Sequence, residues 1–287
     1  VLGDRFELLA VAQVALVSRI PIVHLGGGDV TEGAFDEAIR HSITKMSQLH
    51  FVTNKESEKR VHQLGEDPEN IHLVGNPGLD HLNSLKLMEK NELEKSLRYS
   101  FKSQNILVTF HSVTLDNAPA VNSFSALLEA LDSLGEDIGI IFTRPNSDTE
   151  GRQLIKMLDE YVEDRSNCIA YTSLGQLRYL STVALVDVVV GNSSSGILEV
   201  PSLKTATVNI GDRQKGRLRA DSIIDCEPIT ENIKESIQQA FKLDCSTVVN
   251  PYGDGNTTER VLKVLREINH PERLIKKHFY DIDFEYS

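Results

Sequence analysis

Three serines and two glycines in the segment GNSSSGILE, residues 191–199, form the strongest candidate for a ligand site in this sequence. The segment follows an apolar run typical of a strand and leads directly into a predicted helix. Hydroxyl groups and N–H groups at the positive end of a helix bind anions. One serine would suffice for ordinary N-capping, so three serines beside a glycine favour a phosphate site. The candidate ligands are Ser193, Ser194, Ser195 and Gly196.

Acidic residues dominate a second stretch, HLGGGDVTEGAFDEAIRHSITK, residues 24–45. Asp36 and Glu37 fall in the first turn of a predicted helix, where the helix dipole favours carboxylates. Two neighbouring carboxylates can also have separated pKa values, so that one acts as a base and the other as an acid. Arg40 and His41 follow at i+4, so ordinary pairing on a helix explains them equally well. Acid–base catalysis and a capped helix both remain open for this stretch.

Several single residues follow other predicted strands and are weaker candidates. Asp4 comes after a short first strand, and on composition alone it is best interpreted as the N-cap of a helix beginning at Phe6. His111 ends a strand, where ligand groups gather, although a lone histidine is more often structural. Arg213 lies in GDRQKGR, which is either a surface loop or the cationic partner of a leaving phosphate. Glu199, one turn into its helix, could bind ribose hydroxyls or simply be solvated.

The composition excludes several functional classes. A net charge of −12 over 287 residues disfavours nucleic acid and anionic membranes as partners. Three cysteines without CxxC spacing favour neither a disulfide framework nor a zinc site. The Walker loop, the GxGxxG fingerprint, HExxH and GxSxG are absent. With neither a signal peptide nor an apolar run of about 18 residues, we expect a cytoplasmic protein.

Short apolar runs alternate with stretches of helical periodicity, and this alternation predicts an α/β fold with parallel sheets. Strands are predicted at 20–25, 49–53, 71–75, 105–110, 138–143, 168–172, 186–191 and 205–211. Helices are predicted at 6–17, 36–48, 55–64, about 119–134, 150–163, 174–182, 195–202, 228–242 and 257–268. We place the domain boundary near residue 80. Residues 1–80 then form part of a first domain, residues 81–270 form a second, and residues 271–287 return to the first.

The polar and glycine-rich segments all fall at the carboxyl ends of predicted strands. In open α/β sheets, ligands bind beyond these strand ends. Because each predicted domain presents such an edge, we expect the ligand site in a cleft between the two domains.

Taken together, these segments resemble the UDP-N-acetylglucosamine 2-epimerase family, especially its hydrolysing branch in sialic-acid and related nonulosonic-acid synthesis. The resemblance is carried, in family order along nearly the whole chain, by GDRFELLA, GGDVTEGAFDEAIRHSITKMSQLHFVTN, LVTFHSVT, TRPNSD, GNSSSGILEVPS, NIGDRQKGR and NPYGDGNTTERV. It implies a GT-B architecture, with two Rossmann-like domains and UDP in the cleft. It also implies that the first 90 or so residues of the N-terminal domain are missing here.

The chemistry implied by the resemblance needs neither a metal nor a nicotinamide cofactor. A base removes the proton at C2 of the sugar while UDP leaves C1, which gives a glycal. In the hydrolysing branch, water then adds to C1 and releases the 2-epimeric free sugar, N-acetylmannosamine when UDP-N-acetylglucosamine is the substrate. The family also commonly forms dimers or tetramers, so we expect a homo-oligomer.

The resemblance assigns roles residue by residue. Asp4 and Asp36 would be the acid–base carboxylates, with Glu37 a further candidate beside Asp36. The diphosphate and uridine would contact Arg5, His111 and Asn146, with His111 also counted among the catalytic candidates. Phosphate would lie against Ser193, Ser194 and the neighbouring Ser195 and Gly196, ribose against Glu199, and the nucleotide against Arg213.

One departure from the family pattern leaves the substrate open. The family commonly carries a glutamate two residues after the strand-end histidine, and here Gly26 occupies that place after His24. Asp29, next after the glycines, could act as a shifted acid on the same substrate. A different sugar such as UDP-N,N′-diacetylbacillosamine, or an inactive protein that binds a UDP-sugar, are the alternatives. A GT-B glycosyltransferase would share the same nucleotide site.

Overall fold

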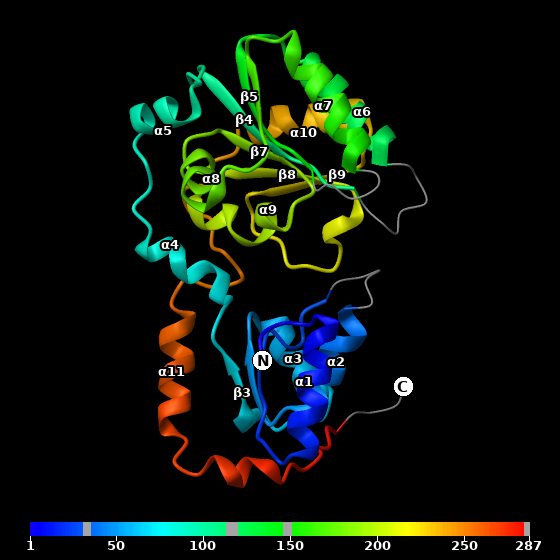
Figure 1. The fold of residues 1–287 in the computed structure, drawn as a ribbon, viewed down its shortest axis with the longest axis vertical. Helices are drawn as coiled ribbons and strands as arrows, with labels where there is room; N and C mark the ends of the chain where they lie inside the picture. The colour runs from blue at the N-terminus through cyan, green and yellow to red at the C-terminus, as the bar shows by residue number, and fades with distance from the viewer. Residues whose placement is uncertain (31–35, 113–119, 146–150, 284–287) are drawn as a thin grey trace. The chain divides into compact units, whose positions relative to one another are not determined.

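The computed structural model describes residues 1–30, 36–112, 120–145 and 151–283. The chain divides into two compact units (Figure 1). One is Val1–Ser84 with Pro251–Ser287, and the other is Leu85–Asn250. From the sequence, these boundaries were expected near residues 80 and 271. The return to the first unit begins earlier because Asp80 accepts hydrogen bonds from the N–H groups of Thr257 and Thr258, at 2.9 and 2.6 Å. Asp80 thereby caps helix α11 (Thr257–Glu267) within the first unit.

The first unit is built on a three-stranded parallel sheet of order β1-β2-β3. The strands are β1 (Val23–Leu25), β2 (Leu49–Val52) and β3 (Ile71–Leu73), and Leu2 adds a parallel bridge beside Leu25. The helices are α1 (Phe6–Val17), α2 (Asp36–Met46), α3 (Lys55–Gln63), α4 (Asp80–Ser84) and α11. Ile43 of α2 packs with residues of α1, whereas Val261 and Val264 of α11 pack on Leu49 and Phe51 of β2.

The second unit carries a six-stranded parallel sheet of order β6-β5-β4-β7-β8-β9. The strands are β4 (Gln104–Thr109), β5 (Ile138–Thr143), β6 (Cys168–Tyr171), β7 (Val188–Gly191), β8 (Ala206–Ile210) and β9 (Ile223–Cys226). This is the doubly wound order, whose direction of winding reverses between the first strand and the fourth, here β4 and β7. A ligand-binding crevice is therefore expected at the carboxyl ends of these two strands.

Helices cover both faces of the six-stranded sheet (Figure 1). They are α5 (Lys90–Leu97), α6 (Ala120–Asp132), α7 (Gly151–Glu163), α8 (Gly175–Val183), α9 (Ser194–Leu198) and α10 (Thr230–Ala240). Ile106 and Val108 of β4 pack with α6, α7 and α10, whereas Leu107 packs with α5 and α8. Because alternate residues of a strand point to opposite faces, a strand buried on both sides becomes the continuous apolar run seen in the sequence.

The predicted α/β architecture is confirmed, with two local corrections. Strand β9 was not predicted, because only two isoleucines mark it between polar residues. The helix predicted at 195–202 ends at Leu198 and is followed by a 3₁₀ turn, Val200–Leu203. Pro201 explains this break, since proline lacks the N–H that would continue an α-helix.

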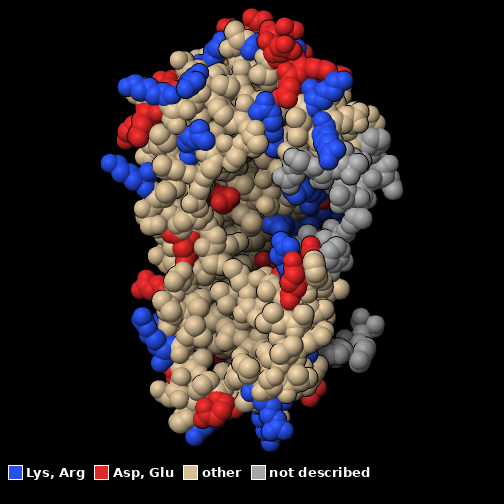
Figure 2. All heavy atoms as spheres, in the orientation of Figure 1, with Lys and Arg blue, Asp and Glu red and all other residues tan. Residues whose placement is uncertain are grey.

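Charged side chains of both signs are interspersed on the face shown in Figure 2. None of the helices in the described ranges is both long and apolar enough to cross a membrane. In the same ranges, no group of three or more His, Cys, Asp or Glu side chains is placed to hold a metal ion.

Candidate functional site

Asn192 connects the ends of β4 and β7, where the winding of the large sheet reverses. Its side-chain oxygen accepts from the His111 N–H, its side-chain nitrogen donates to the His111 carbonyl, and both distances are 2.8 Å. Its own N–H donates to the Thr109 carbonyl at 3.2 Å. The predicted ligand His111 therefore lies directly beside the serine loop, Asn192–Ser195.

Gly191 allows β4 and β7 to approach closely just before this loop. Its φ is +141°, and a Cβ placed on it would lie 1.9 Å from the Thr109 carbonyl oxygen. The obstructing atom belongs to the backbone, so no rotamer change could relieve the clash. Glycine is thus required for the geometry that brings His111 and the serine loop together.

The serine loop begins α9, and each of its serines has its own position. Ser193 is the N-cap residue, and its side chain accepts from the Ser195 N–H at 3.4 Å. Ser194 is the first residue of the helix. The Ser195 hydroxyl accepts from the Tyr179 hydroxyl at 2.9 Å. Capping thus accounts for one serine, as expected, and Tyr179 of α8 is a partner that the sequence did not indicate.

Burial raises the pKa of the Tyr179 phenol, and the hydrogen bond to Ser195 offsets only part of this effect. Tyr179 therefore stays protonated at neutral pH and can donate to Ser195. Glu199, at the end of α9, adds a smaller electrostatic contribution that also raises this pKa, so its carboxylate lies within range of the same loop. The predicted ribose ligand and the predicted phosphate ligands are thereby close to one another.

Gly196 has a structural explanation in this geometry. It is buried against β8, and a Cβ on it would lie 2.9 Å from the Thr207 methyl group. Its N–H donates to the Ser193 carbonyl at 3.2 Å, and its carbonyl accepts from the Thr207 hydroxyl at 3.0 Å. Gly196 is therefore needed for α9 to pack on the sheet, and its binding role stays a prediction.

The loop after β8 contacts the serine loop through Asn192. The Arg213 guanidinium and the Gln214 amide both donate to the Asn192 carbonyl, at 3.0 and 2.9 Å. This contact places the predicted cation Arg213 at the same strand ends as His111 and Ser193. Asn146, the remaining predicted nucleotide contact, lies outside the described residues.

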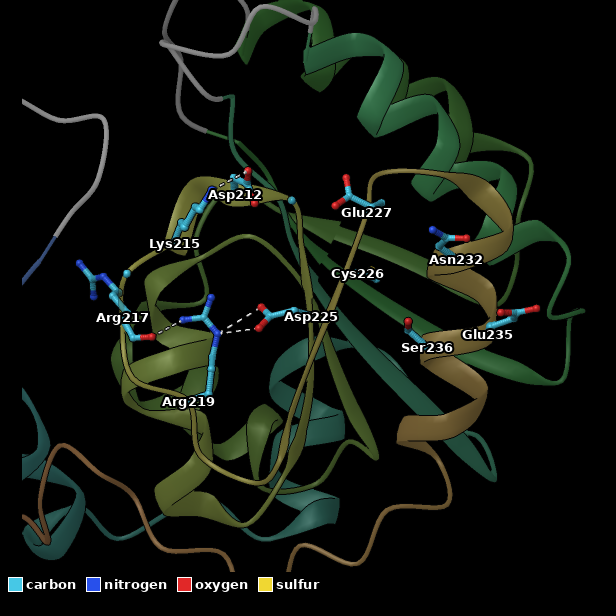
Figure 3. A pocket seen from close by; sticks show the side chains of 12 residues that line it. Asp212, Lys215, Arg217, Arg219, Asp225, Cys226, Glu227, Asn232, Glu235 and Ser236 are labelled. Carbon is cyan, nitrogen blue, oxygen red and sulfur yellow. Dashed lines mark hydrogen bonds and ion pairs between the residues drawn. The ribbon is translucent and has the colours of Figure 1, made fainter.

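A wide groove of 690 Å³ lies farther along this edge, at the ends of β8 and β9 (Figure 3). Its charges are largely compensated within the protein: Arg219 binds Asp225 at 2.9 Å, and Lys215 lies 3.8 Å from Asp212. The groove therefore lacks the surplus of positive charge that an anionic ligand requires.

In the first unit, a buried arginine holds the predicted catalytic Asp4. Arg40 Nε donates to Asp4 Oδ2 at 2.9 Å, and Nη2 contacts the same oxygen. The Arg40 side chain is 4% exposed and that of Asp4 is 29% exposed. The interpretation of Asp4 as a helix N-cap was wrong, because the N-cap residue of α1 is Arg5. The long-range pair with Arg40 determines where the Asp4 carboxylate lies.

The other predicted residues of the first unit are placed around this pair. Asp36 and Glu37 begin α2, as predicted, and Glu37 lies 3.9 Å from His41 one turn later. Arg5 is largely exposed and pairs with Glu7 at 2.8 Å, which is the main reason why its pKa is raised. Asp36 adds a smaller electrostatic contribution to that rise.

Asp29 is held by the residues that end β2 and begin α3. Its Oδ1 accepts from the hydroxyls of Thr53 and Ser57, at 2.6 and 2.5 Å, and from the Asn54 amide at 3.3 Å. Its carbonyl accepts from Arg40 Nη1 at 2.5 Å. These contacts explain Asp29 as an anchor for the loop, and its catalytic role stays a prediction.

The three glycines before Asp29 serve different geometric purposes. Gly26 has φ +84° with open space where a Cβ would lie, whereas a Cβ on Gly28 would lie 2.3 Å from the Ser57 carbonyl oxygen. Gly27 faces His24 and Thr44, with a Cβ distance of 2.9 Å to the Thr44 hydroxyl. A glutamate at Gly26 would have a strained left-handed backbone. Restoring the glutamate of the family pattern would therefore require a different backbone conformation in this loop.

Each unit thus gathers its own predicted residues. The second unit brings together His111, the three serines, Glu199 and Arg213, and the first unit carries Asp4, Arg5, Asp29, Asp36 and Glu37. Sequence reasoning missed Tyr179 and Asn192 as partners, and it explained Arg40 only by local helix pairing. The GNSSSG motif contained the signal for Asn192, whereas nothing local distinguished Tyr179.

Comparison with known proteins supports a single family. The family profile described as UDP-N-acetylglucosamine 2-epimerase matches residues 1–266. The chain is 37% identical over 285 residues to the GDP/UDP-N,N′-diacetylbacillosamine 2-epimerase (hydrolyzing) of Campylobacter jejuni, covering 98% of this chain and 74% of that protein. It is 34% identical over 276 residues to the UDP-N,N′-diacetylbacillosamine 2-epimerase (hydrolyzing) of Legionella pneumophila, covering 96% and 72%.

Solved structures of epimerases have the same fold as this chain. The crystal structure of UDP-GlcNAc 2-epimerase from Neisseria meningitidis bound to UDP-GlcNAc superposes with a TM-score of 0.78 at 18% identity, covering 93% of this chain and 75% of that one. The fold is accordingly of the GT-B type, with two Rossmann-like units, as the sequence resemblance implied. This chain belongs to the UDP-N-acetylglucosamine 2-epimerase family.

Proposed function

We propose that this protein is a hydrolysing UDP-sugar 2-epimerase. The observation that carries the proposal is the Asp4 carboxylate paired with the buried Arg40, in a chain whose second unit presents hydroxyls, His111 and Arg213 at one strand edge. The first group suits proton transfer and the second suits a diphosphate. Family membership connects the two groups to one reaction.

In this proposal, the second unit binds UDP. The hydroxyls of Ser193, Ser194 and Ser195 donate to phosphate oxygens. Arg213 and His111 stabilise the negative charge that develops on the departing diphosphate, because preorganised donors act most strongly where charge accumulates. Glu199 binds the ribose hydroxyls, and Asn146 contacts the nucleotide.

The first unit supplies the acid and the base. One of Asp4 and Asp36 removes the proton at C2 of the sugar as the bond from C1 to the UDP oxygen breaks, and the electron pair forms the C1–C2 double bond of a glycal. Water then adds at C1 and a proton returns to C2 from the opposite face. The products are UDP and the free sugar epimeric at C2. Asp29 and Glu37 are the further carboxylates available for these proton transfers.

The substrate class is a UDP-linked 2-acetamido sugar. UDP-N,N′-diacetylbacillosamine is the favoured member, because two relatives above 30% identity carry that sugar in their names. On sequence alone UDP-N-acetylglucosamine was preferred, and it stays the second candidate because a relative from Neisseria meningitidis serogroup B, 32% identical over 284 residues, is named UDP-N-acetylglucosamine 2-epimerase.

Turnover assays with the full-length protein and both UDP-sugars test the proposal. We expect release of UDP and of a free 2-epimeric sugar from one of them. Asp4→Asn and Asp36→Asn should lower kcat about 10²–10⁴-fold and leave the Kd for UDP nearly unchanged, since they remove proton transfer. Asp164→Asn, on an exposed carboxylate, is the matched control.

Other outcomes would identify the alternatives. Full activity of Asp36→Asn would refute the assignment of that residue. A requirement for an acceptor sugar would indicate a glycosyltransferase, and tight UDP binding without turnover of either sugar would indicate a binding protein.

A further inference from the structure

Asp4 is held against helix α2 at two points, one on its side chain and one on its backbone. The side chain binds Arg40 of α2. The backbone is held one residue earlier, where the Gly3 carbonyl contacts His24 Nε2 at 2.9 Å. His24 Nδ1 in turn contacts the hydroxyl of Thr44, one helical turn beyond Arg40, at 3.1 Å.

The protonation state of His24 follows from these contacts. A carbonyl only accepts hydrogen bonds, so Nε2 carries the proton and donates to Gly3. Burial lowers the pKa of His24 to about 4, so the ring is neutral near pH 7. Nδ1 then lacks a proton and can only accept, so it competes with the Arg40 carbonyl, at 3.0 Å, for the single proton of the Thr44 hydroxyl. The neutral tautomer with its proton on Nε2 is therefore the one compatible with both His24 contacts.

Close packing holds the ring in place. His24 and Thr44 are both fully buried. Gly27 lies against the pair, since a Cβ there would come 2.9 Å from the Thr44 hydroxyl and 3.1 Å from His24 Nδ1. Its backbone φ is outside the left-handed region, so glycine is needed at this position for the space it leaves to His24 and Thr44.

We propose that His24 and Thr44 are positioning residues for proton transfer by Asp4. They hold the Gly3–Asp4 backbone against α2, so that the Asp4 carboxylate remains on Arg40. Neither residue touches substrate in this proposal, which rests on the proposed function of Asp4. A displacement of about 1 Å at a reacting group costs up to about 10²-fold in rate. Loss of the contact to Gly3 should therefore lower kcat about 10–10²-fold.

Two pairs of substitutions in the full-length protein separate positioning from stability. His24→Gln places an amide N–H near Nε2 and retains the donor to Gly3, whereas His24→Asn places its amide near Nδ1 and loses that donor. Thr44→Ser keeps the hydroxyl, whereas Thr44→Val removes it with little change in shape. Tm, the Kd for UDP, KM and kcat are measured for all four variants with the UDP-sugar that the wild type turns over.

We expect His24→Asn and Thr44→Val to lower kcat at least about 10-fold with KM and UDP affinity retained. We expect His24→Gln and Thr44→Ser to restore most of the rate. Gly27→Ala, which crowds the pair without touching Asp4, should act like Thr44→Val. If His24→Asn and His24→Gln lose the same rate, or lose only Tm, the proposal is wrong.

The Asp4→Asn variant distinguishes failure of this proposal from failure of the proposed function. If Asp4→Asn abolishes turnover while folded His24→Asn and Thr44→Val remain fully active, the positioning role alone fails. If Asp4→Asn is itself fully active, the proposed role of Asp4 fails together with the positioning role.

Discussion

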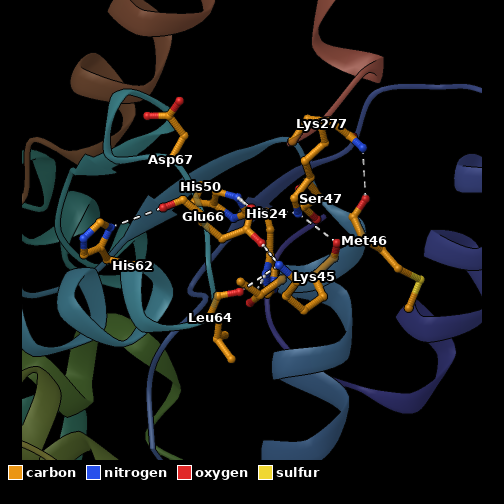
Figure 4. Close-up of polar contacts among 12 residues, drawn as sticks. His24, Lys45, Met46, Ser47, His50, His62, Leu64, Glu66, Asp67 and Lys277 are labelled. Atoms are coloured by element: carbon orange, nitrogen blue, oxygen red, sulfur yellow. Dashed lines mark hydrogen bonds and ion pairs between the residues drawn. The ribbon is translucent and has the colours of Figure 1, made fainter. Parts of the chain in front are cut away.

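Glu66 is a buried carboxylate within a cluster of polar contacts (Figure 4). The free energy of unfolding that is lost when it is replaced can be calculated. Its oxygens accept from His50 Nε2 at 2.9 Å and from the ammonium groups of Lys45 and Lys277 at 2.7 Å each. Lys277 Nζ also donates to the Lys45 and Ser47 carbonyls at the end of α2. Burial alone would raise the pKa of Glu66, but the three hydrogen bonds outweigh it and lower the pKa to about 2.

The shifted pKa gives the magnitude. The pKa lies about 2.5 units below its ordinary value of 4.5, which corresponds to about 3 kcal/mol of stability at neutral pH. The Glu66→Gln variant should lose about this much, because the partly buried ammonium groups of Lys45 and Lys277 lose their counter-charge. The contribution of a carboxyl with a lowered pKa is complete above the unfolded pKa and is lost as pH falls towards the folded one. The difference between wild type and Glu66→Gln should therefore shrink by about 1.4 kcal/mol by about pH 3.5.

Urea unfolding followed by circular dichroism, at neutral and at acidic pH, measures both quantities. Glu69→Gln, three residues away on the surface, is the matched control and should change stability by less than about 0.5 kcal/mol. A loss below about 1 kcal/mol in Glu66→Gln, or a loss that does not change on acidification, would refute the reasoning.

Three further predictions follow from the geometry. Gly191→Ala should destabilise the second unit by about 3 kcal/mol or more in chemical denaturation, because its Cβ would meet a backbone oxygen. The control Gly135→Ala, whose left-handed φ lies in open space, should cost only about 1–2 kcal/mol in the same assay. Ser194→Ala should weaken UDP binding about 10-fold by calorimetry with kcat less affected, and unchanged affinity would contradict a phosphate role for this loop. The pKa of His24 is lowered to about 4 in the folded protein, so between about pH 6.5 and 4 the unfolded chain binds more protons than the folded one. As pH drops through this window, the free energy of unfolding of the wild type should therefore fall by up to about 3 kcal/mol more than that of His24→Gln.

Local patterns in the sequence were sufficient for the sheets and for the edge of the second unit where ligands are expected. Strands buried on both faces are continuous apolar runs, and each ends in polar residues, so the chain order alone located His111, the serine loop and Arg213. Strand β9 escaped this logic because it lies at the edge of the sheet, with only partly buried isoleucines.

Contacts between residues far apart in sequence could not be predicted from spacing. Arg40 binds Asp4 across 36 positions, and Asp80 caps α11 across 177. Arg40 and Asp4 each had a satisfactory local explanation, as a helix pair and as an N-cap, and only the long-range contact between α2 and the segment before α1 decides otherwise. The triple glycine had the same difficulty, since its meaning depends on His24, Thr44 and Ser57, which surround it in space.

Solvent deuterium incorporation tests the proposed reaction most directly. The full-length protein is incubated with UDP-N,N′-diacetylbacillosamine, and in parallel with UDP-N-acetylglucosamine, in deuterated water, and the free sugar is examined by NMR and mass spectrometry. The glycal route predicts one deuterium at C2 of the released 2-epimeric sugar, together with one UDP for each sugar. Release of UDP with a sugar that retains its original hydrogen at C2 would contradict it.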